Sequence, residues 1–325
     1  MYKRTCFITT IFLVLFLCTT LRGNETLQLY FPSNVGSFWV YSDQDGNEFT
    51  RHAIEGEEIS GVYYNAFSYD PELEDWVDFN RHTVPYLYNV NEEWISLLVE
   101  EEIENAVKAR LTNEFETFSA LVKNLFANLI PPEENITVDF FYDIEVEADE
   151  HFNLLPADAN IDDEWETSEI TATATMSFEF QGLPEELAAA APPMPPVTVT
   201  FSILETGIVL DTETVETAAG TFENCLKIEY RTETELASDQ PEDPGPDNPP
   251  GETVTTLWLA PNIGIVKYHQ EAQKIFLNLM SEKELAEASV APEEAAEITA
   301  TTIKSFELSN YEIAAAPEQE DDGRE

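Results

Sequence analysis

Ile136-Thr-Val-Asp-Phe-Phe-Tyr-Asp-Ile-Glu-Val-Glu-Ala148 is the stretch of the sequence that decides the fold. Its even-numbered positions are apolar, whereas its odd-numbered positions are mostly acidic or polar. This alternation with a period of two is typical of a β-strand that has one packed face and one solvated face. The same alternation returns in Ile170–Phe180 and in Val197–Ile203. These segments predict an antiparallel sheet with an apolar inside and an acidic outside.

The first two of these strands are long. Each can reach about 11–13 residues, or roughly 40 Å at the rise of an extended chain. Long antiparallel strands twist, and a sheet built from them curls. We therefore expect a trough or half-barrel, and the predicted fold class is α+β, mainly β.

A long amphipathic helix is expected beside this sheet. Apolar residues recur at steps of three and four from Ile103 to Leu129, and Pro131-Pro132 ends the run. We place a helical insert at residues 93–130, with the helix itself spanning about 45 Å on the concave face of the sheet. A coiled coil with a partner helix is the alternative. The polar side of the helix is expected to carry Glu104, Lys108, Glu114 and Lys123.

The first 23 residues have the composition of a secretory signal peptide. Basic residues precede an apolar run from Phe7 to Leu17, and Gly23 offers a small residue for cleavage. The run is shorter than the roughly 20 residues of a membrane span, so an uncleaved anchor is the weaker alternative. Lipidation of Cys18 is another alternative, although Leu17 stands where such sites have a small residue. The sequence predicts an exported protein, periplasmic or extracellular.

The remainder is expected to be one domain with mobile flanks. Residues 24–313 form the predicted domain, with Pro-rich surface loops at residues 182–196 and 238–251. Residues 282–297 are expected to add a short helix before a final strand, and residues 314–325 an acidic, disordered tail.

A weak internal repeat runs through the predicted domain. Phe31-Pro32 precedes Trp39, and Leu155-Pro156 precedes Trp165, each before a group of strands. This echo indicates two related β-halves, and an unrepeated sheet is the alternative.

Charge limits the partners of the protein. The chain has 64 acidic residues against 15 basic ones, a formal net charge of -49. Such a charge repels phosphate backbones and anionic membrane surfaces, so we expect neither nucleic acid nor an anionic membrane as a partner. The scattered carboxylates are typical of a solvated face, and divalent-cation binding is the alternative. Composition does not predict the oligomeric state.

Motifs of catalysis are missing from the sequence. It has no Gly-x-Ser-x-Gly elbow, no His-Glu-x-x-His and no phosphate loop. Cys225 is the single cysteine after the signal peptide and falls within a predicted strand, as a buried structural thiol would. We therefore predict that the protein is not an enzyme. A hydrolase that uses Cys225 or a histidine is the remaining alternative.

One group of residues has the spacing of a calcium loop. Asp158, Asn160, Asp162 and Glu169 could offer oxygen ligands at alternate positions of a turning chain. The pattern departs from a calcium loop because Asp163 replaces the usual glycine and Glu169 begins a strand. Calcium at these residues is the one cofactor hypothesis, and no other cofactor is expected.

Three segments resemble a known family. Tyr30–Tyr41, Ala219–Cys225 and Leu257–Tyr268 are similar to the TapB-like group of secreted or periplasmic bacterial proteins and lipoproteins, which is related to domain of unknown function 3108. The resemblance is best over residues 30–70 and 215–270. It implies export and a sheet similar to the half-barrels of lipoprotein carriers, and it implies no functional residues.

These features predict a noncatalytic protein that binds an apolar or lipid-like ligand in the trough between sheet and helix. A filled core in place of the trough is the alternative for the same aromatic residues. The alternative function is a cell-envelope or surface interaction module with an acidic, cation-bridged face. The residues predicted to line the ligand site are Phe140, Tyr142, Phe178 and Phe180.

Overall fold

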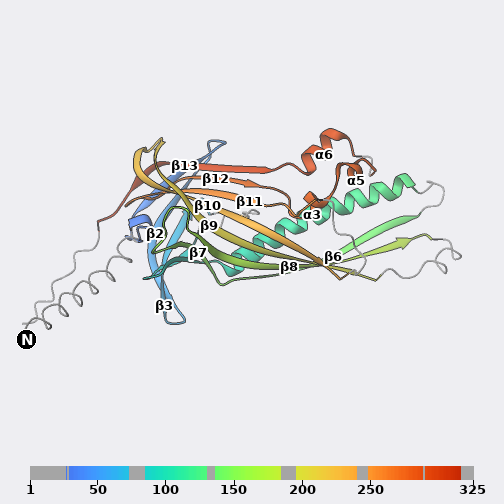
Figure 1. Cartoon of the computed structure of the whole chain (residues 1–325), viewed down its shortest axis with the longest axis horizontal. Helices are drawn as coiled ribbons and strands as arrows, with labels where there is room; N and C mark the ends of the chain where they lie inside the picture. Colours follow the sequence, from blue (N-terminus) through green and yellow to red (C-terminus); the bar gives the residue numbers. More distant parts are fainter. Residues whose placement is uncertain are drawn as a thin grey trace, which may run out of the picture.

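The computed structural model describes residues 27, 29–72, 85–129, 136–183, 195–239, 248–287 and 290–315. Its 13 strands form a single sheet in the order β6-β8-β9-β10-β11-β12-β13-β1-β2-β3-β4-β5-β7. Neighbouring strands pair antiparallel, which confirms the predicted fold class. Figure 1 shows an elongated, strongly twisted sheet with the long helix α3 lying along its hollow side.

The elements follow one another in a simple chain order. The strands are β1 (Phe38–Asp43), β2 (Glu48–Ile59), β3 (Val62–Asp70), β4 (Leu87–Val90), β5 (Trp94–Leu98), β6 (Thr137–Ala148), β7 (His151–Pro156), β8 (Glu164–Gln181), β9 (Val197–Thr217), β10 (Gly220–Ser238), β11 (Thr253–Ala260), β12 (Gly264–Ala272) and β13 (Thr302–Glu312). The helices are α3 (Glu100–Leu129), the 3-10 turn η2 (Leu277–Leu279), α5 (Glu282–Glu287) and α6 (Pro292–Ile298).

Alternating side chains give the sheet its two faces. In β6 the apolar residues Val138, Phe140 and Ile144 are buried, whereas Asp143 and Glu145 are exposed. The long strands bend because bulges interrupt their pairing, for example in β8 after its third residue and twice in β10. Bends and twist together produce the predicted curl, and the two edge strands, β6 and β7, follow each other directly in the sequence.

Helix α3 contains the predicted apolar steps from Ile103 to Leu129, and the predicted insert at residues 93–130 also contains a strand. Its first part, Trp94–Leu98, is the strand β5, which pairs with β4 and β7. This short apolar segment fits a strand because both of its neighbours supply backbone hydrogen bonds. The predicted short helix at residues 282–297 is also divided, into α5 and α6.

Several predictions lie outside the described residues. These are the signal peptide at residues 1–23, most of the Pro-rich loops at 182–196 and 238–251, and the tail from residue 316 onward. The repeat of Phe31-Pro32 and Leu155-Pro156 stays a prediction. Among the described residues, none of the helices is both long enough and apolar enough to cross a membrane.

Gly207 of β9 leaves room for the indole ring of Trp165 on the neighbouring strand β8. It lies opposite Trp165 in the pairing of β8 and β9, and an added Cβ would lie 2.6 Å from two atoms of that ring. The ring cannot turn away easily because its Nε1 donates a hydrogen bond to the carbonyl of Asn153 at 3.0 Å.

We expect Gly207→Ala to lower the free energy of unfolding by about 2 kcal/mol, as overpacking does elsewhere. Urea unfolding would measure the loss. The matched control is Thr206→Ala, one residue earlier and half-buried, which should change stability by less than about 0.5 kcal/mol. Equal effects of the two substitutions would contradict the close packing.

Candidate apolar binding site

Helix α3 turns its predicted apolar stripe toward the sheet. Ile103, Val107, Leu111 and Phe115 are at most 2% exposed, which confirms the stripe over the first half of the helix. In the second half the aromatic side chain of Phe118 is only half-buried. The helix is therefore sealed against the sheet at its start and less completely covered toward its end.

An aromatic cluster fills the space between α3 and the strands. We call it the aromatic seam; its members are Phe115, Phe118 and Phe126 of α3, Phe140 and Tyr142 of β6, Phe178 and Phe180 of β8, and Phe276 before η2. Ring centroids of Phe118 and Phe140 are 5.4 Å apart, and those of Phe126 and Phe180 are 5.1 Å apart. These distances are typical of attractive aromatic pairs.

The structure brings the four predicted ligand residues to one side of the sheet. Phe140 pairs directly with Phe178 across β6 and β8, with ring centroids 5.0 Å apart. Phe140 is 7% exposed, whereas Tyr142, Phe178 and Phe180 are half-buried. All four belong to the aromatic seam. Their role in binding a ligand stays a prediction.

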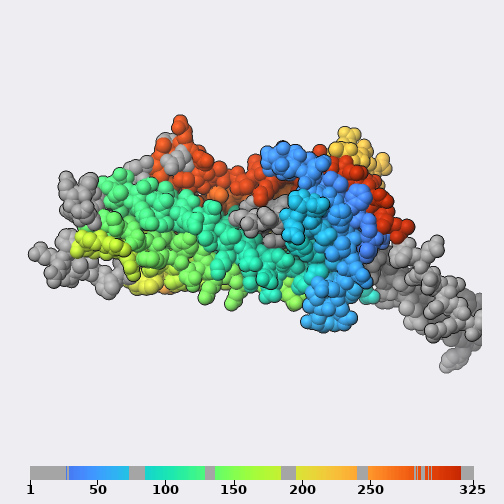
Figure 2. Space-filling model, turned by 180° about the vertical axis from the view of Figure 1, so that it is seen from behind, coloured from blue at the N-terminus to red at the C-terminus, as the bar shows by residue number. Residues whose placement is uncertain are grey.

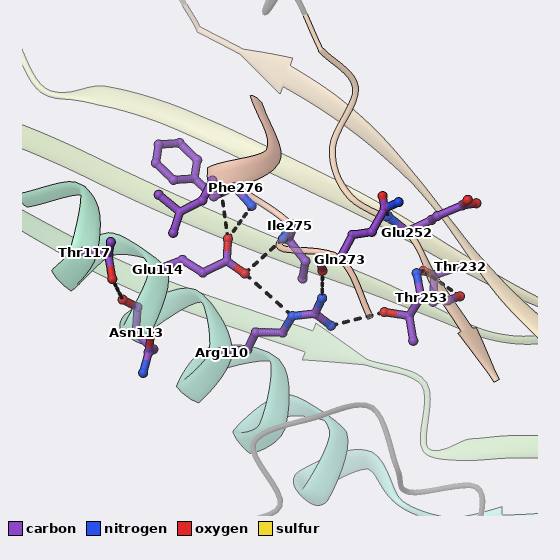
Figure 3. Close-up of polar contacts among 11 residues, drawn as sticks. Arg110, Asn113, Glu114, Thr117, Thr232, Glu252, Thr253, Gln273, Ile275 and Phe276 are labelled. Carbon is purple, nitrogen blue, oxygen red and sulfur yellow. Dashed lines mark hydrogen bonds and ion pairs between the residues drawn. The ribbon is translucent and has the colours of Figure 1, made fainter. Parts of the chain in front are cut away.

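A polar latch joins α3 to the segment after β12 (Figure 3). The carboxylate of Glu114 accepts hydrogen bonds from the backbone N–H groups of Ile275, Phe276 and Leu277 at 2.9, 2.7 and 2.9 Å. Arg110 lies one turn earlier, with its Nε 3.7 Å from Glu114 Oε1. We call Arg110 and Glu114 the latch, because together they hold this segment against the helix.

Arg110 extends the latch to the sheet. Its guanidinium donates to Thr253 Oγ1 at 3.3 Å and to the carbonyl of Gln273. Glu114 is 1% exposed, so its predicted place on the polar side of the helix is wrong. The charge is tolerated inside because three N–H donors and a guanidinium surround it. The i, i+4 spacing of Arg110 and Glu114 next to the apolar stripe was the only signal in the sequence.

The C-terminal helices cover another side of α3. Leu121 of α3 packs with Leu285 of α5 and Val290 in a small separate apolar cluster. Figure 2 shows α3 reaching the molecular surface between these helices and the strands β6 and β8. The helix therefore has protein on two sides and solvent on a third, where Lys108 and Lys123 are exposed.

The predicted calcium residues lie in and after the turn that follows β7. The side-chain amide of Asn160 donates to the carbonyl of Asp158 and to the carboxylate of Asp163, both at 2.8 Å. Glu169 lies on β8, and its backbone N–H donates to Asp149. Among the described residues no group of three or more His, Cys, Asp or Glu side chains is placed to hold a metal ion. Calcium at Asp158, Asn160, Asp162 and Glu169 stays a prediction.

Reactive side chains are dispersed or buried. Cys225 is fully buried in β10, as predicted, and burial raises the pKa of its thiol. His151 accepts or donates a hydrogen bond at 2.8 Å to the hydroxyl of Tyr64, and burial raises the pKa of that phenol. Neither shift favours a nucleophile, because both keep the group protonated.

A second buried carboxyl group, like that of Glu114, was not expected from the sequence. Glu205 of β9 is 1% exposed and burial raises its pKa to about 8. Its backbone carbonyl accepts a hydrogen bond from the hydroxyl of Thr167 at 2.9 Å. Glu205 occupies a position that faces inward in the alternation of its strand, and the raised pKa favours its neutral form.

The comparisons with known proteins agree with the predicted family relationship. Residues 200–285 match the family model described as DUF3108-like, which confirms the relationship to domain of unknown function 3108 over that segment. It spans β10, β11 and β12. A comparison with curated protein sequences gives no significant match.

Two solved bacterial structures are similar to the chain at low identity. One is a candidate exported protein with a YmcC-like fold from Bacteroides fragilis: it is 14% identical, with a TM-score of 0.36, over 88% of this chain and 99% of that chain. The other is a candidate lipoprotein from Parabacteroides distasonis, 14% identical, with a TM-score of 0.32, over 87% of this chain and 98% of that chain.

Proposed function

We propose that the protein is exported, is noncatalytic, and binds an apolar, lipid-like ligand in the aromatic seam. The observation that carries this proposal is the uneven burial of the seam. Phe115 and Phe140 are buried, whereas Phe126, Phe178 and Phe180 are half-buried. A cluster of rings that continues from the core to the surface is a suitable apolar binding site.

The way in which α3 contacts the sheet supports the same proposal. The seam consists of ring contacts, which have no directional hydrogen bond to break when the helix moves aside. The latch at Arg110 and Glu114 lies near the middle of α3, well before Phe126. The part of the seam at Phe126, Phe178 and Phe180 therefore lies beyond the polar contacts of the latch. A ligand chain would insert beside Phe178 and Phe180.

Native mass spectrometry of the processed protein tests the proposal directly. Protein purified from its own envelope without detergent should carry one lipid-sized ligand per chain, released on denaturation. Protein that is fully apo, and that takes up no dodecanol or dodecanoate when these are added, would contradict the proposal.

A pair of substitutions locates the site. Phe178→Ser should weaken the binding of dodecanol about tenfold, because one ring contact of about 1.4 kcal/mol is lost. The matched control is Phe141→Ser: Phe141 lies opposite Ser177 in the same strand pair but points outward and is 50% exposed. Isothermal titration calorimetry would compare the two. Equal weakening by both substitutions would place the ligand elsewhere.

A further inference from the structure

A buried arginine lies at the other end of the sheet interior. Arg51 of β2 is 1% exposed, and it stands between Trp39 of β1 and Tyr69 of β3 in the strand register. Its Nε and Nη1 are buried and have no hydrogen-bond partner among the described residues. Within the same part of the chain no carboxylate lies at ion-pair distance from it.

Aromatic rings surround the guanidinium. The Cζ atom of Arg51 is 4.4 Å from the ring centroid of Phe67, 4.5 Å from that of Trp39, 5.5 Å from Tyr41 and 5.7 Å from Phe31. We call these four residues the Arg51 cage. Ring faces attract a cation, and so they offset part of the cost of its burial. They do not accept the in-plane N–H hydrogen bonds, which stay unmade.

An unpaired buried cation is exceptional in a chain with 64 acidic residues. Buried charges are ordinarily paired and hydrogen-bonded, and a buried donor without an acceptor is unfavourable. Arg110, the other arginine that is buried among the described residues, pairs with Glu114. The described residues therefore supply no anionic partner for Arg51.

We propose that Arg51 binds the carboxylate of a fatty-acid-like ligand whose apolar chain lies in the interior of the curled sheet. This inference rests on the proposed function and names the class of its ligand. A carboxylate fits because its two oxygens lie in one plane and match the planar donors of a guanidinium. The attached chain must be apolar, because the Arg51 cage belongs to the buried apolar core, which also includes Phe115, Phe140 and Phe276 of the aromatic seam.

A single negative charge also suits the site better than several. Arg51 neutralises one charge, and every further charge of a polyanion would enter an apolar interior without a partner. The net charge of -49 repels all anions, but salt screens a monoanion outside the protein, and Arg51 supplies the local attraction inside.

A short segment closes the Arg51 cage in this structure. Residues 29–32, here called the strap, place the buried ring of Phe31 against the guanidinium. The strap is held by a hydrogen bond of 2.5 Å from the N–H of Asn262 to the carbonyl of Leu29. A Cβ at Gly264 would lie 3.6 Å from the carbonyl oxygen of Tyr30 and 3.7 Å from Nη2 of Arg51, so strap, turn and guanidinium meet there. Entry of a carboxylate at this end requires the strap to move.

The test compares two ligands that differ only in the head group. Dodecanoate and dodecanol, each below its aggregation limit at pH 7.5, are titrated into the delipidated full chain and into Arg51→Met and Arg231→Met. Arg231 is the matched control, because it lies on the outer face of β10 and pairs with Glu229 and Glu252. Methionine at position 51 is apolar and fits the cage, and a melting curve of each variant establishes that it is folded.

We expect the wild-type protein to bind dodecanoate at least tenfold more tightly than dodecanol. Arg51→Met should abolish this preference by weakening dodecanoate binding, whereas Arg231→Met should retain it. Equal binding of both ligands by the wild-type protein would overturn the role of Arg51 while leaving the proposed function intact, and this comparison needs no variant. If acetate binds as tightly as dodecanoate, the apolar chain of the ligand contributes nothing to binding, and this part of the proposal would be wrong. Failure of both twelve-carbon ligands to bind would overturn the proposed function itself.

Discussion

Glu114→Ala is expected to lower the free energy of unfolding by about 3–5 kcal/mol, because it removes one partner of a buried charge pair. The substitution leaves three backbone N–H groups, those of Ile275, Phe276 and Leu277, without their acceptor. It also leaves the buried guanidinium of Arg110 without its carboxylate. Urea unfolding followed by circular dichroism would measure the loss, and proteolysis would report loosening of the segment after β12.

The helix itself supplies the control for this prediction. Glu116 is exposed two residues later on α3, and Glu116→Ala should change stability by less than about 0.5 kcal/mol. The loss of stability for Glu114→Gln should lie between the losses for these two variants. The amide oxygen of glutamine still accepts hydrogen bonds, but it carries no charge to pair with Arg110. A loss of less than about 1 kcal/mol for Glu114→Ala would mean that water replaces the carboxylate without cost, and the latch would not be structural.

The sequence predicts α3 well because its signals are local. The apolar steps from Ile103 onward define one face, and Pro131-Pro132 defines the end, so the helix from Glu100 to Leu129 needs no knowledge of its partners. The strand β6 is predicted for the same reason, since alternation within the segment fixes both its length and its inner face. The alternation alone also places the even-numbered residues Phe140 and Tyr142 on the inner face of the sheet.

Features that depend on partners far away in the sequence were missed. Trp94–Leu98 is a strand because β4 and β7 lie on either side of it, and nothing within the segment distinguishes it from the first turn of a helix. Glu114 is predicted to face solvent because a carboxylate normally does, and only the N–H groups of residues 275–277 make its burial possible.

The candidate site shows the same division. Four of its aromatic rings follow from alternation in two strands, but Phe276 joins them from a segment beyond β12. Arg51 could not be distinguished from a surface arginine in a strand, although it lies on the same parity as the buried Phe49 and Ala53. That parity was the available signal, and it favours an inward guanidinium in a strand whose inner positions are otherwise apolar.

Burial of Glu205 makes stability depend on pH with a defined sign. The folded-state pKa is raised to about 8, above the ordinary value of 4.5 that applies to the unfolded chain. The cause is desolvation, because the carboxyl is buried in β9. Between these two pKa values the unfolded chain has lost its proton and the folded protein has kept it. The contribution of Glu205 to stability is therefore complete below about pH 4.5, is lost as the pH rises toward 8, and does not change further above it.

Glu205→Gln should remove this pH dependence and make the protein more stable at high pH. One pKa unit corresponds to about 1.4 kcal/mol, and the folded and unfolded pKa values differ by roughly 3.5, so we expect the variant to exceed the wild-type protein by about 5 kcal/mol at pH 8.5 and by almost nothing at pH 4.5. Urea unfolding at a series of pH values measures the difference directly. The matched control, Glu233→Gln, changes an exposed carboxylate on the neighbouring strand and should shift stability equally little at every pH. If the difference in unfolding free energy between Glu205→Gln and wild type is the same at every pH, Glu205 ionises in the folded protein as it does in the unfolded chain. That result would contradict the desolvation of Glu205.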